Sequence, residues 1–283
     1  MFIINPISGI GRQKRFEGII RDHLDKERFC PTIQYTEYPG HATKLAADAV
    51  GVFDVVTAVG GDGSINEIAK ALVNTSTALA IIPCGSGNGL ARALNIPTDP
   101  IKAVEALAVS EFRRIDTCYV NDRFFISLAG AGYDSLVARL YDFYPGRGFK
   151  TYFKAVINSY FQYKPREYDI NVDGHDIKCN ALLVTVCNSS QYGYGFRIAP
   201  EAKLDDGMLD VVIMKKPEWW RVPFVLLAVA LGRAHKSCCL EVVRGAHVEL
   251  TGNESRWVNL DGETVRMDSN LRFDISSQVS VFC

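Results

Sequence analysis

The sequence predicts two domains: an α/β domain with a mainly parallel sheet, followed by a β-rich domain with an antiparallel sheet. Over the first hundred or so residues, short apolar runs alternate with segments whose apolar residues recur at helical spacing, as in parallel sheets covered by helices on both faces. After about residue 115, short strand-like runs and two-residue turns predominate, which indicates antiparallel hairpins. We therefore expect domains at 1–115 and 116–283, a division that the length of 283 residues favours.

The first domain is expected to contain four strands, each followed by a helix. Ala42, Leu45, Ala46 and Ala49, for example, repeat at the spacing of one helix face. Because ligands of such sheets bind beyond the carboxyl ends of the strands, we expect the functional residues directly after these runs. The strands are predicted at 2–5, 32–36, 54–59 and 78–83.

The second domain is predicted from its turns. Asn121 with Asp122, and Asp173 with Gly174, each separate two apolar runs and suit hairpin turns that need positive φ. Further strand-like runs continue to the end of the chain, and we expect helices only near 148–164 and 217–232.

Composition excludes several classes of protein. Hydrophobic residues make up 48% and charged residues 22%, which is typical of a globular chain and not of a disordered one. The net charge of −1 argues against nucleic acid as a partner. The eight cysteines show neither zinc spacing nor a disulfide framework, so we expect reduced thiols and a cytoplasmic protein. The apolar run 222–232 falls short of the about 20 residues that a membrane span needs.

Three glycine-bearing turns occupy equivalent places after the first, third and fourth strands, at 5–11, 60–64 and 83–89. Glycine allows positive φ and lets backbone N–H groups approach an anion closely, and a helix that begins just afterwards aims further N–H groups at the same place. Three such turns at one edge of a sheet predict a triphosphate site. The spacing matches neither a P-loop nor a dinucleotide-binding fingerprint.

The polar residues of these turns have two interpretations. Ser64 and Glu67 have the spacing of a capping box, so they either begin a helix or serve the site. Asn88 is either a helix N-cap or a site residue. Asp62 is harder to explain structurally, because a carboxylate beside phosphates repels them unless Mg²⁺ lies between.

The sequence resembles the diacylglycerol kinase catalytic-domain family, which includes bacterial lipid kinases and the sphingosine and ceramide kinases. Five motifs in order carry the resemblance: NPISG, GGDGS, PCGSGNGLARAL, KLDDGMLDVVI and NLDGE. It implies ATP-dependent phosphorylation of a lipid hydroxyl, with ATP and Mg²⁺ bound between an α/β domain and a β-rich domain. The second glycine loop is closer to the sphingosine kinase form, which points towards sphingoid bases without excluding diacylglycerol-type lipids.

The resemblance also implies roles for individual residues. ATP phosphates would be contacted by residues of the first motif, and the nucleotide would be lined by two residues after the second strand. The residues concerned are Asn5, Ser8 and Gly9 for the phosphates, Thr36 and His41 for the nucleotide, Gly61, Asp62, Gly63 and Ser64 with Glu67 in the first glycine loop, and Gly85, Ser86 and Asn88 in the second.

In the β-rich half, the resemblance implies a structural Mg²⁺ site at Lys203 (through its carbonyl), Asp206 and Met208. Asp261, Gly262 and Glu263 match a DGE motif whose glutamate is the usual candidate for the catalytic base, whereas sphingosine kinases give that role to the aspartate equivalent to Asp62. Which of the two acts here stays open.

Asp116 is a candidate for orienting the acceptor's head group, with a turn residue as the alternative.

Two stretches are candidates for contact with lipid or a membrane surface. Segment 143–166 mixes aromatic and basic residues, and 219–231 begins with two tryptophans and continues into the apolar run. A helix that faces the core is the alternative for both.

Rival functions are an NAD kinase and a lipid-binding protein of the same fold without catalysis. The oligomeric state, a homodimer included, stays open.

Overall fold

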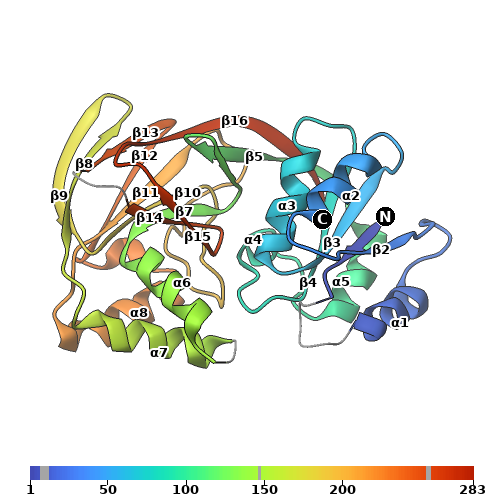
Figure 1. Cartoon of the computed structure of the whole chain (residues 1–283), viewed down its shortest axis with the longest axis horizontal. Helices are drawn as coiled ribbons and strands as arrows, with labels where there is room; N and C mark the ends of the chain where they lie inside the picture. The colour runs from blue at the N-terminus through green and yellow to red at the C-terminus, as the bar shows by residue number, and fades with distance from the viewer. Residues whose placement is uncertain (7–12, 146–147, 253–255) are drawn as a thin grey trace. The chain divides into compact units, whose positions relative to one another are not determined.

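The computed structural model describes residues 1–6, 13–145, 148–252 and 256–283 (Figure 1). They form two compact units. The first contains Met1–Thr117 and Ser277–Cys283, and the second contains Cys118–Ser276. The chain passes between the units within two strands, β5 (Phe112–Val120) and β16 (Leu271–Phe282).

The first unit has the predicted parallel sheet, in the order β2 (Ile33–Tyr35), β1 (Phe2–Ile4), β3 (Val55–Gly60) and β4 (Ala78–Pro83). The end of β16 adds a further parallel strand beside β4. Because side chains alternate along a strand, both faces of the sheet carry apolar residues that must be covered. The sheet is therefore a buried layer with helices on each side.

Helices α1 (Gln13–His23) and α5 (Pro100–Ala106) share one core with residues such as Ile4 and Val59. Helices α2 (His41–Ala49) and α3 (Asp62–Leu72) pack against each other on the other face, over buried residues such as Val56 (Figure 1). The short helix α4 (Gly89–Ala93) follows β4, and the turn η1 (Leu107–Val109) follows α5. The predicted alternation of strands and helices is confirmed.

The second unit contains an antiparallel sheet in the order β12-β11-β10-β7-β14-β15. A second set of antiparallel strands pairs the start of β16 with β13, β13 with β8, and β8 with β9, while β6 pairs with β5. One core lies between them, with Phe125, Val184, Val211 and Phe273 among its members. The strands are β6 (Arg123–Phe125), β7 (Leu128–Gly132), β8 (Arg166–Val172), β9 (His175–Ala181), β10 (Leu183–Cys187), β11 (Leu209–Met214), β12 (Leu240–Gly245), β13 (His247–Thr251), β14 (Arg256–Leu260) and β15 (Glu263–Met267).

The predicted hairpin turns are confirmed by the backbone. Asn121 has φ 53°, and Asp173 and Gly174 have φ 47° and 88°. Asp261 and Gly262 form a third turn of this kind, with φ 49° and 98°, between β14 and β15.

The predicted helices of the second half are α7 (Phe149–Tyr160) and α8 (Val222–Ala230), flanked by the short turns η2 (Trp219–Arg221) and η3 (Ala234–Lys236). The sequence prediction missed a further helix, α6 (Tyr133–Phe143), whose apolar face includes Val137. Helix α6 follows strand β7 without a loop between them. The change in the spacing of apolar residues from that of a strand to that of a helix is therefore easily overlooked in the sequence. Among the described helices, none has both the length and the apolar composition of a membrane span.

Candidate functional site

The residues predicted to bind the nucleotide follow the carboxyl ends of the four parallel strands. Backbone hydrogen bonds join these exits: Thr36 donates to Ile4, Asn5 to Val59, and Cys84 to Gly60, at 3.0, 3.1 and 2.8 Å. The structure therefore brings these turns together at one edge of the sheet. Ser8 and Gly9 lie outside the described residues.

The two glycine loops after β3 and β4 touch through their backbones. A Cβ atom on Gly61 would lie 3.2 Å from the Cα of Gly85, and one on Gly85 would lie 2.6 Å from the Cα of Gly61. Neither residue has positive φ. Glycine is needed here because the two loops approach closely, and not because of a positive φ.

Asp62 joins the two loops. Its carboxylate accepts hydrogen bonds from the backbone N–H groups of Asn88, at 2.9 Å, and Gly89, at 2.8 Å. Those groups begin helix α4, where backbone donors lack partners within the helix and a negative charge is stabilised. Asp62 thus fixes the second glycine loop against the first, which the sequence alone did not indicate.

Asn88 lies at the N-cap of α4 with φ 53°, but its side chain does not cap the helix. Its amide nitrogen donates to the carbonyl of Gly85 at 3.0 Å. Its Oδ1 is buried and has no hydrogen-bond partner in the part of the chain that the structure describes. A buried oxygen without a hydrogen bond lowers the stability of the fold. Such groups are rare in native proteins, and some of them lie in functional sites. The N-cap interpretation is therefore incomplete.

The capping-box interpretation of Ser64 and Glu67 is wrong. Helix α3 begins at Asp62, with Gly61 as its N-cap, and Gly63 lies in its first turn. Ser64 Oγ instead accepts a hydrogen bond from the side chain of Asn5 at 2.9 Å. Glu67 Oε1 accepts one from the backbone of Gly40 at 3.1 Å. Both side chains thus tie the turns after β1 and β2 to α3.

The turn before α2 is held by His41. Its Nδ1 accepts a hydrogen bond from the backbone N–H of Glu37 at 3.1 Å, which leaves the proton of the neutral ring on Nε2. The ring stacks on Tyr38, with centroids 4.5 Å apart. Thr36 is buried, and Ser86, in the second glycine loop, is exposed.

Cys84 also lies in the second loop. Burial raises the pKa of its thiol to about 12, so the reactive thiolate is scarce at neutral pH. It acts as a small filler there. All eight cysteines of the chain are free.

Asp261 is the second carboxylate that binds backbone groups. Within the second unit it accepts hydrogen bonds from the N–H groups of Ile126, Ser127 and Leu128, at 2.8, 2.8 and 3.0 Å. The side chain is buried and shapes the entry to β7. Glu263, two residues later at the start of β15, is exposed.

The implied structural Mg²⁺ site does not fit the arrangement of its residues. Asp206 accepts a hydrogen bond from the backbone of Met208 at 3.2 Å and pairs with Arg244 Nη2 at 3.0 Å. The same guanidinium reaches Asp210 at 3.4 Å and the carbonyl of Glu201 at 3.3 Å. An arginine thus occupies the position of a cation, and Lys203 is exposed nearby. Among the described residues, no three His, Cys, Asp or Glu side chains form a metal-binding group.

Asp116 is buried within β5, so the turn interpretation is wrong. Its Oδ1 accepts a hydrogen bond from Gln278 Nε2, on β16, at 2.9 Å. This contact links two strands of the first unit and favours a structural role.

Asp134 was missed by the sequence interpretation. It lies buried in the first turn of α6, where Tyr192 donates to its Oδ2 at 3.3 Å and Oδ1 has no partner among the described residues. Burial raises the pKa of Asp134 to about 7. A Cβ on Gly130 would lie 1.7 Å from Oδ2, so that glycine makes room for the carboxylate. The signal in the sequence was a Gly-rich strand end followed by an aspartate.

Comparison with known proteins identifies the family. The diacylglycerol kinase catalytic domain matches residues 1–120, and the YegS C-terminal NAD kinase beta sandwich-like domain matches 127–275. A diacylglycerol kinase of Bacillus subtilis is 30% identical over 270 residues, which cover 92% of this chain and 88% of that protein. The chain belongs to the diacylglycerol kinase catalytic-domain family.

Other members agree with this assignment. A diacylglycerol kinase of Staphylococcus saprophyticus is 28% identical, over 92% of this chain and 87% of its own. A solved structure of a diacylglycerol kinase from Bacillus anthracis has a TM-score of 0.72 at 20% identity, covering 98% of this chain and 92% of that one. At that identity the likeness supports the fold, with its α/β and β-rich parts.

Proposed function

We propose that the chain is an ATP:lipid phosphotransferase, which transfers the γ-phosphate of ATP to a hydroxyl group of a lipid. One observation carries the proposal: Asp62 joins two glycine loops that touch at Gly61 and Gly85, at the carboxyl edge of a parallel sheet. Backbone loops in this position suit phosphate groups. Membership of a family whose relatives are named kinases supports the chemistry.

Phosphoryl transfer depends mainly on alignment and charge neutralisation. In this proposal the two glycine loops align the β- and γ-phosphates through backbone N–H groups other than those of Asn88 and Gly89, which already donate to Asp62. Mg²⁺, when bound with ATP, would supply positive charge beside the phosphates. Asp62 and the unpartnered Oδ1 of Asn88 fit that ion, because carboxylate and amide oxygens are ligands that it accepts.

Glu263 is our candidate for the base that accepts the proton of the lipid hydroxyl. Both carboxylate oxygens of Asp62 already accept backbone hydrogen bonds, so this side chain is engaged in holding the loops together. Asp261 binds three backbone N–H groups and acts as a positioning residue for the turn that carries Glu263. General base catalysis typically contributes on the order of 10²- to 10⁴-fold.

The acceptor is tested with labelled ATP and a panel of lipids in mixed micelles: diacylglycerol, sphinganine and phosphatidylglycerol. The relatives are named diacylglycerol kinases, whereas the second glycine loop resembles the sphingosine kinase form, so both acceptors belong in the panel. We expect label in one lipid, and a loss of about 10²-fold or more in Glu263→Gln with ATP affinity retained. Label in NAD, or bound ATP without transfer to any acceptor, would contradict the proposal in favour of an NAD kinase or a non-catalytic protein.

We further propose that the protein is cytoplasmic and that α8 contacts the membrane surface from which the lipid is taken. The α8 apolar surface comprises Trp219, Trp220, Phe224, Leu227 and Leu231, which are 48–69% exposed, whereas only Val225 and Val229 of this helix are buried. A core-facing helix would bury these large side chains. Tryptophans beside exposed aliphatic residues suit the boundary between lipid headgroups and acyl chains.

Helix α7 lies beside this surface, since Tyr160 donates a hydrogen bond to the carbonyl of Pro217. Phe161, just past its end, is 70% exposed. Vesicle sedimentation tests the contact: Phe224→Ser with Leu227→Ser should reduce binding to phospholipid vesicles about tenfold or more, given about 25 cal/mol per Å² of apolar area. Unchanged sedimentation would exclude α8 as the membrane surface.

A further inference from the structure

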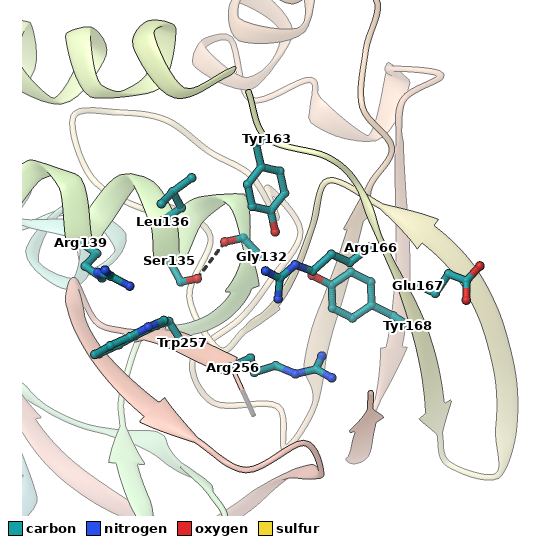
Figure 2. Close-up of a pocket in the computed structure, with 10 residues that line it drawn as sticks. All are labelled: Gly132, Ser135, Leu136, Arg139, Tyr163, Arg166, Glu167, Tyr168, Arg256 and Trp257. Atoms are coloured by element: carbon teal, nitrogen blue, oxygen red, sulfur yellow. Dashed lines mark hydrogen bonds between the residues drawn. The ribbon is translucent and has the colours of Figure 1, made fainter. Parts of the chain in front are cut away.

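The second unit contains a pocket of about 500 Å³ that the proposed transfer reaction does not use (Figure 2). Its wall is formed by α6, by the start of β8 with the residues before it, and by the start of β14. The side chains that define it are Arg139, Arg166, Arg256, Tyr163, Tyr168 and Trp257. The volume lies within the range of small-molecule sites, about 300–1,000 Å³.

The pocket is positively charged. Three arginines face one acidic residue, Glu167, whose carboxylate points away from the other side chains (Figure 2). Within the described ranges, no carboxylate forms an ion pair with any of the three arginines. Their formal charges and that of Glu167 add to 3 − 1 = +2.

Arg256 shows that this charge is built into the fold. Its side chain is only 8% exposed, and a Cβ on Gly252 would lie 1.4 Å from its Nη2, so the chain leaves space for the guanidinium. Burial lowers the pKa of Arg256, and the nearby charge of Arg166 lowers it further. No carboxylate among the described residues pairs with Arg256. A buried cation that lacks such a partner is costly, and a bound anion would relieve that cost.

Aromatic rings hold the arginines in place. The guanidinium of Arg139 lies over Trp257 at 4.7 Å, and that of Arg256 lies over Tyr168 at 5.3 Å from the ring centroid. The buried Oη of Tyr163 makes no hydrogen bond in the part of the chain that the structure describes, and it points towards Arg166 (Figure 2). The pocket thus offers pre-oriented donors with an unsatisfied hydroxyl among them.

We propose that this pocket binds a phosphate ester. A phosphomonoester carries about −1.5 to −2 charges and three acceptor oxygens, which match the net charge and the guanidinium forks. Trp257 and Leu136, which line the pocket, accommodate the organic group. The ester is either a soluble organophosphate or the headgroup of an anionic phospholipid, and both present the same chemistry. The site lies wholly within the second unit and does not depend on the proposed function.

The test measures binding to the full-length protein without nucleotide, so that failure of the kinase reaction does not affect it. The probes are inorganic phosphate, glycerol 3-phosphate, and phosphatidylcholine vesicles with or without phosphatidic acid. Fluorescence of Trp257 and calorimetry report binding. Arg139 and Arg166 are exposed, so Arg139→Gln with Arg166→Gln should fold. The control, Arg123→Gln with Arg233→Gln, removes the same charge from exposed positions outside the pocket.

We expect the pocket variant to bind glycerol 3-phosphate or phosphatidic acid vesicles at least tenfold more weakly than the control variant, which should match the unaltered protein. Binding of the soluble ester identifies an organophosphate site, and binding of phosphatidic acid vesicles alone identifies a lipid headgroup site. Tyr163→Phe, which keeps the ring, should weaken binding a few-fold. Equal affinities in the pocket and control variants, or no binding of any probe, would overturn the proposal.

Discussion

The glycine loops of the first unit and the arginine pocket of the second are built for anions in different ways. The loops offer backbone N–H groups from two turns that touch at Gly61 and Gly85. The pocket offers side-chain cations held by aromatic rings. Backbone donors add no charge of their own, so the loops suit a ligand that arrives with its own metal ion. The pocket carries a net positive charge, so it suits an anionic ligand that brings no metal ion.

Each unit also has an aspartate in the first turn of a helix, Asp62 in α3 and Asp134 in α6, and the surroundings of the two carboxylates differ. Asp62 accepts two backbone hydrogen bonds from the turn that begins α4. Asp134, in the first turn of α6, is buried with one oxygen unpaired among the described residues. Hydrogen bonds to a carboxylate favour its charged form, whereas burial disfavours it. The same residue type therefore holds two loops together in one unit and has a raised pKa in the other.

Gly85→Val should have the largest effect, because it removes the close contact of the loops. Its Cβ would lie 2.6 Å from the backbone of Gly61, so the loops must separate. A displacement of about 1 Å at a phosphoryl-transfer site costs on the order of 10²-fold in rate. We expect kcat/KM for lipid phosphorylation to fall by that factor. Gly18→Ala, in α1 and with its nearest neighbour 3.9 Å away, is the control and should leave activity unchanged. Equal rates in the two variants would show that the contact does not matter.

Asp134→Asn should change how stability depends on pH. The pKa of Asp134 is raised to about 7 in the folded protein, against about 3.9 in an unfolded chain. Between these values the folded state keeps a proton that the unfolded state has lost, so this group lowers stability as pH rises from about 4 to about 7, by up to about 1.4 kcal/mol per pH unit. Above pH 7 its contribution is constant.

The side chain of the Asp134→Asn variant cannot ionise. The free energy of unfolding of this variant should therefore fall less between about pH 4 and about pH 7 than that of the unaltered protein. Urea unfolding of both proteins at pH 5 and pH 7 measures it. If the free energy of unfolding changes equally with pH in both, Asp134 is not the group responsible.

Arg244→Gln should have the smallest effect. The arginine pairs with Asp206 and Asp210, but its side chain is 39% exposed, and such pairs contribute about 0–1 kcal/mol. We expect a decrease of that size in the free energy of unfolding. EDTA should not alter the melting temperature of the unaltered protein, because the guanidinium supplies the positive charge. A fall of several degrees with EDTA would instead indicate a structural metal ion.

The difference between the two regions also explains how far the sequence could be interpreted. The strands, helices and glycine loops of the first unit were predictable, because each is specified by neighbouring residues. Asp62 stood out in the sequence because glycines flank it, but its partners Asn88 and Gly89 lie far along the chain and emerged only in the structure.

The arginine pocket was not predictable. Arg139, Arg166 and Arg256 come from three distant segments that the fold brings together. Only Arg166 lies in a stretch that the sequence marked, the aromatic and basic segment 143–166, and nothing in that stretch indicates the other two arginines. Arg244 is a similar case: the motif around Asp206 implied a metal ion, whereas the partner on β12 could be found only from the pairing of β11 with β12.

The affinity for MgATP of Asp62→Asn and Asp261→Asn, compared by calorimetry, tests the proposed nucleotide site most directly. Both substitutions remove a charge that accepts backbone hydrogen bonds, but only Asp62 joins the glycine loops. Hydrogen bonds to a charged group contribute about 1.5–3 kcal/mol, which is roughly a 10- to 100-fold change in affinity. We expect a loss of that size in Asp62→Asn and a change of less than about twofold in Asp261→Asn. Unaltered affinity in Asp62→Asn would contradict the role of the glycine loops as the ATP phosphate site.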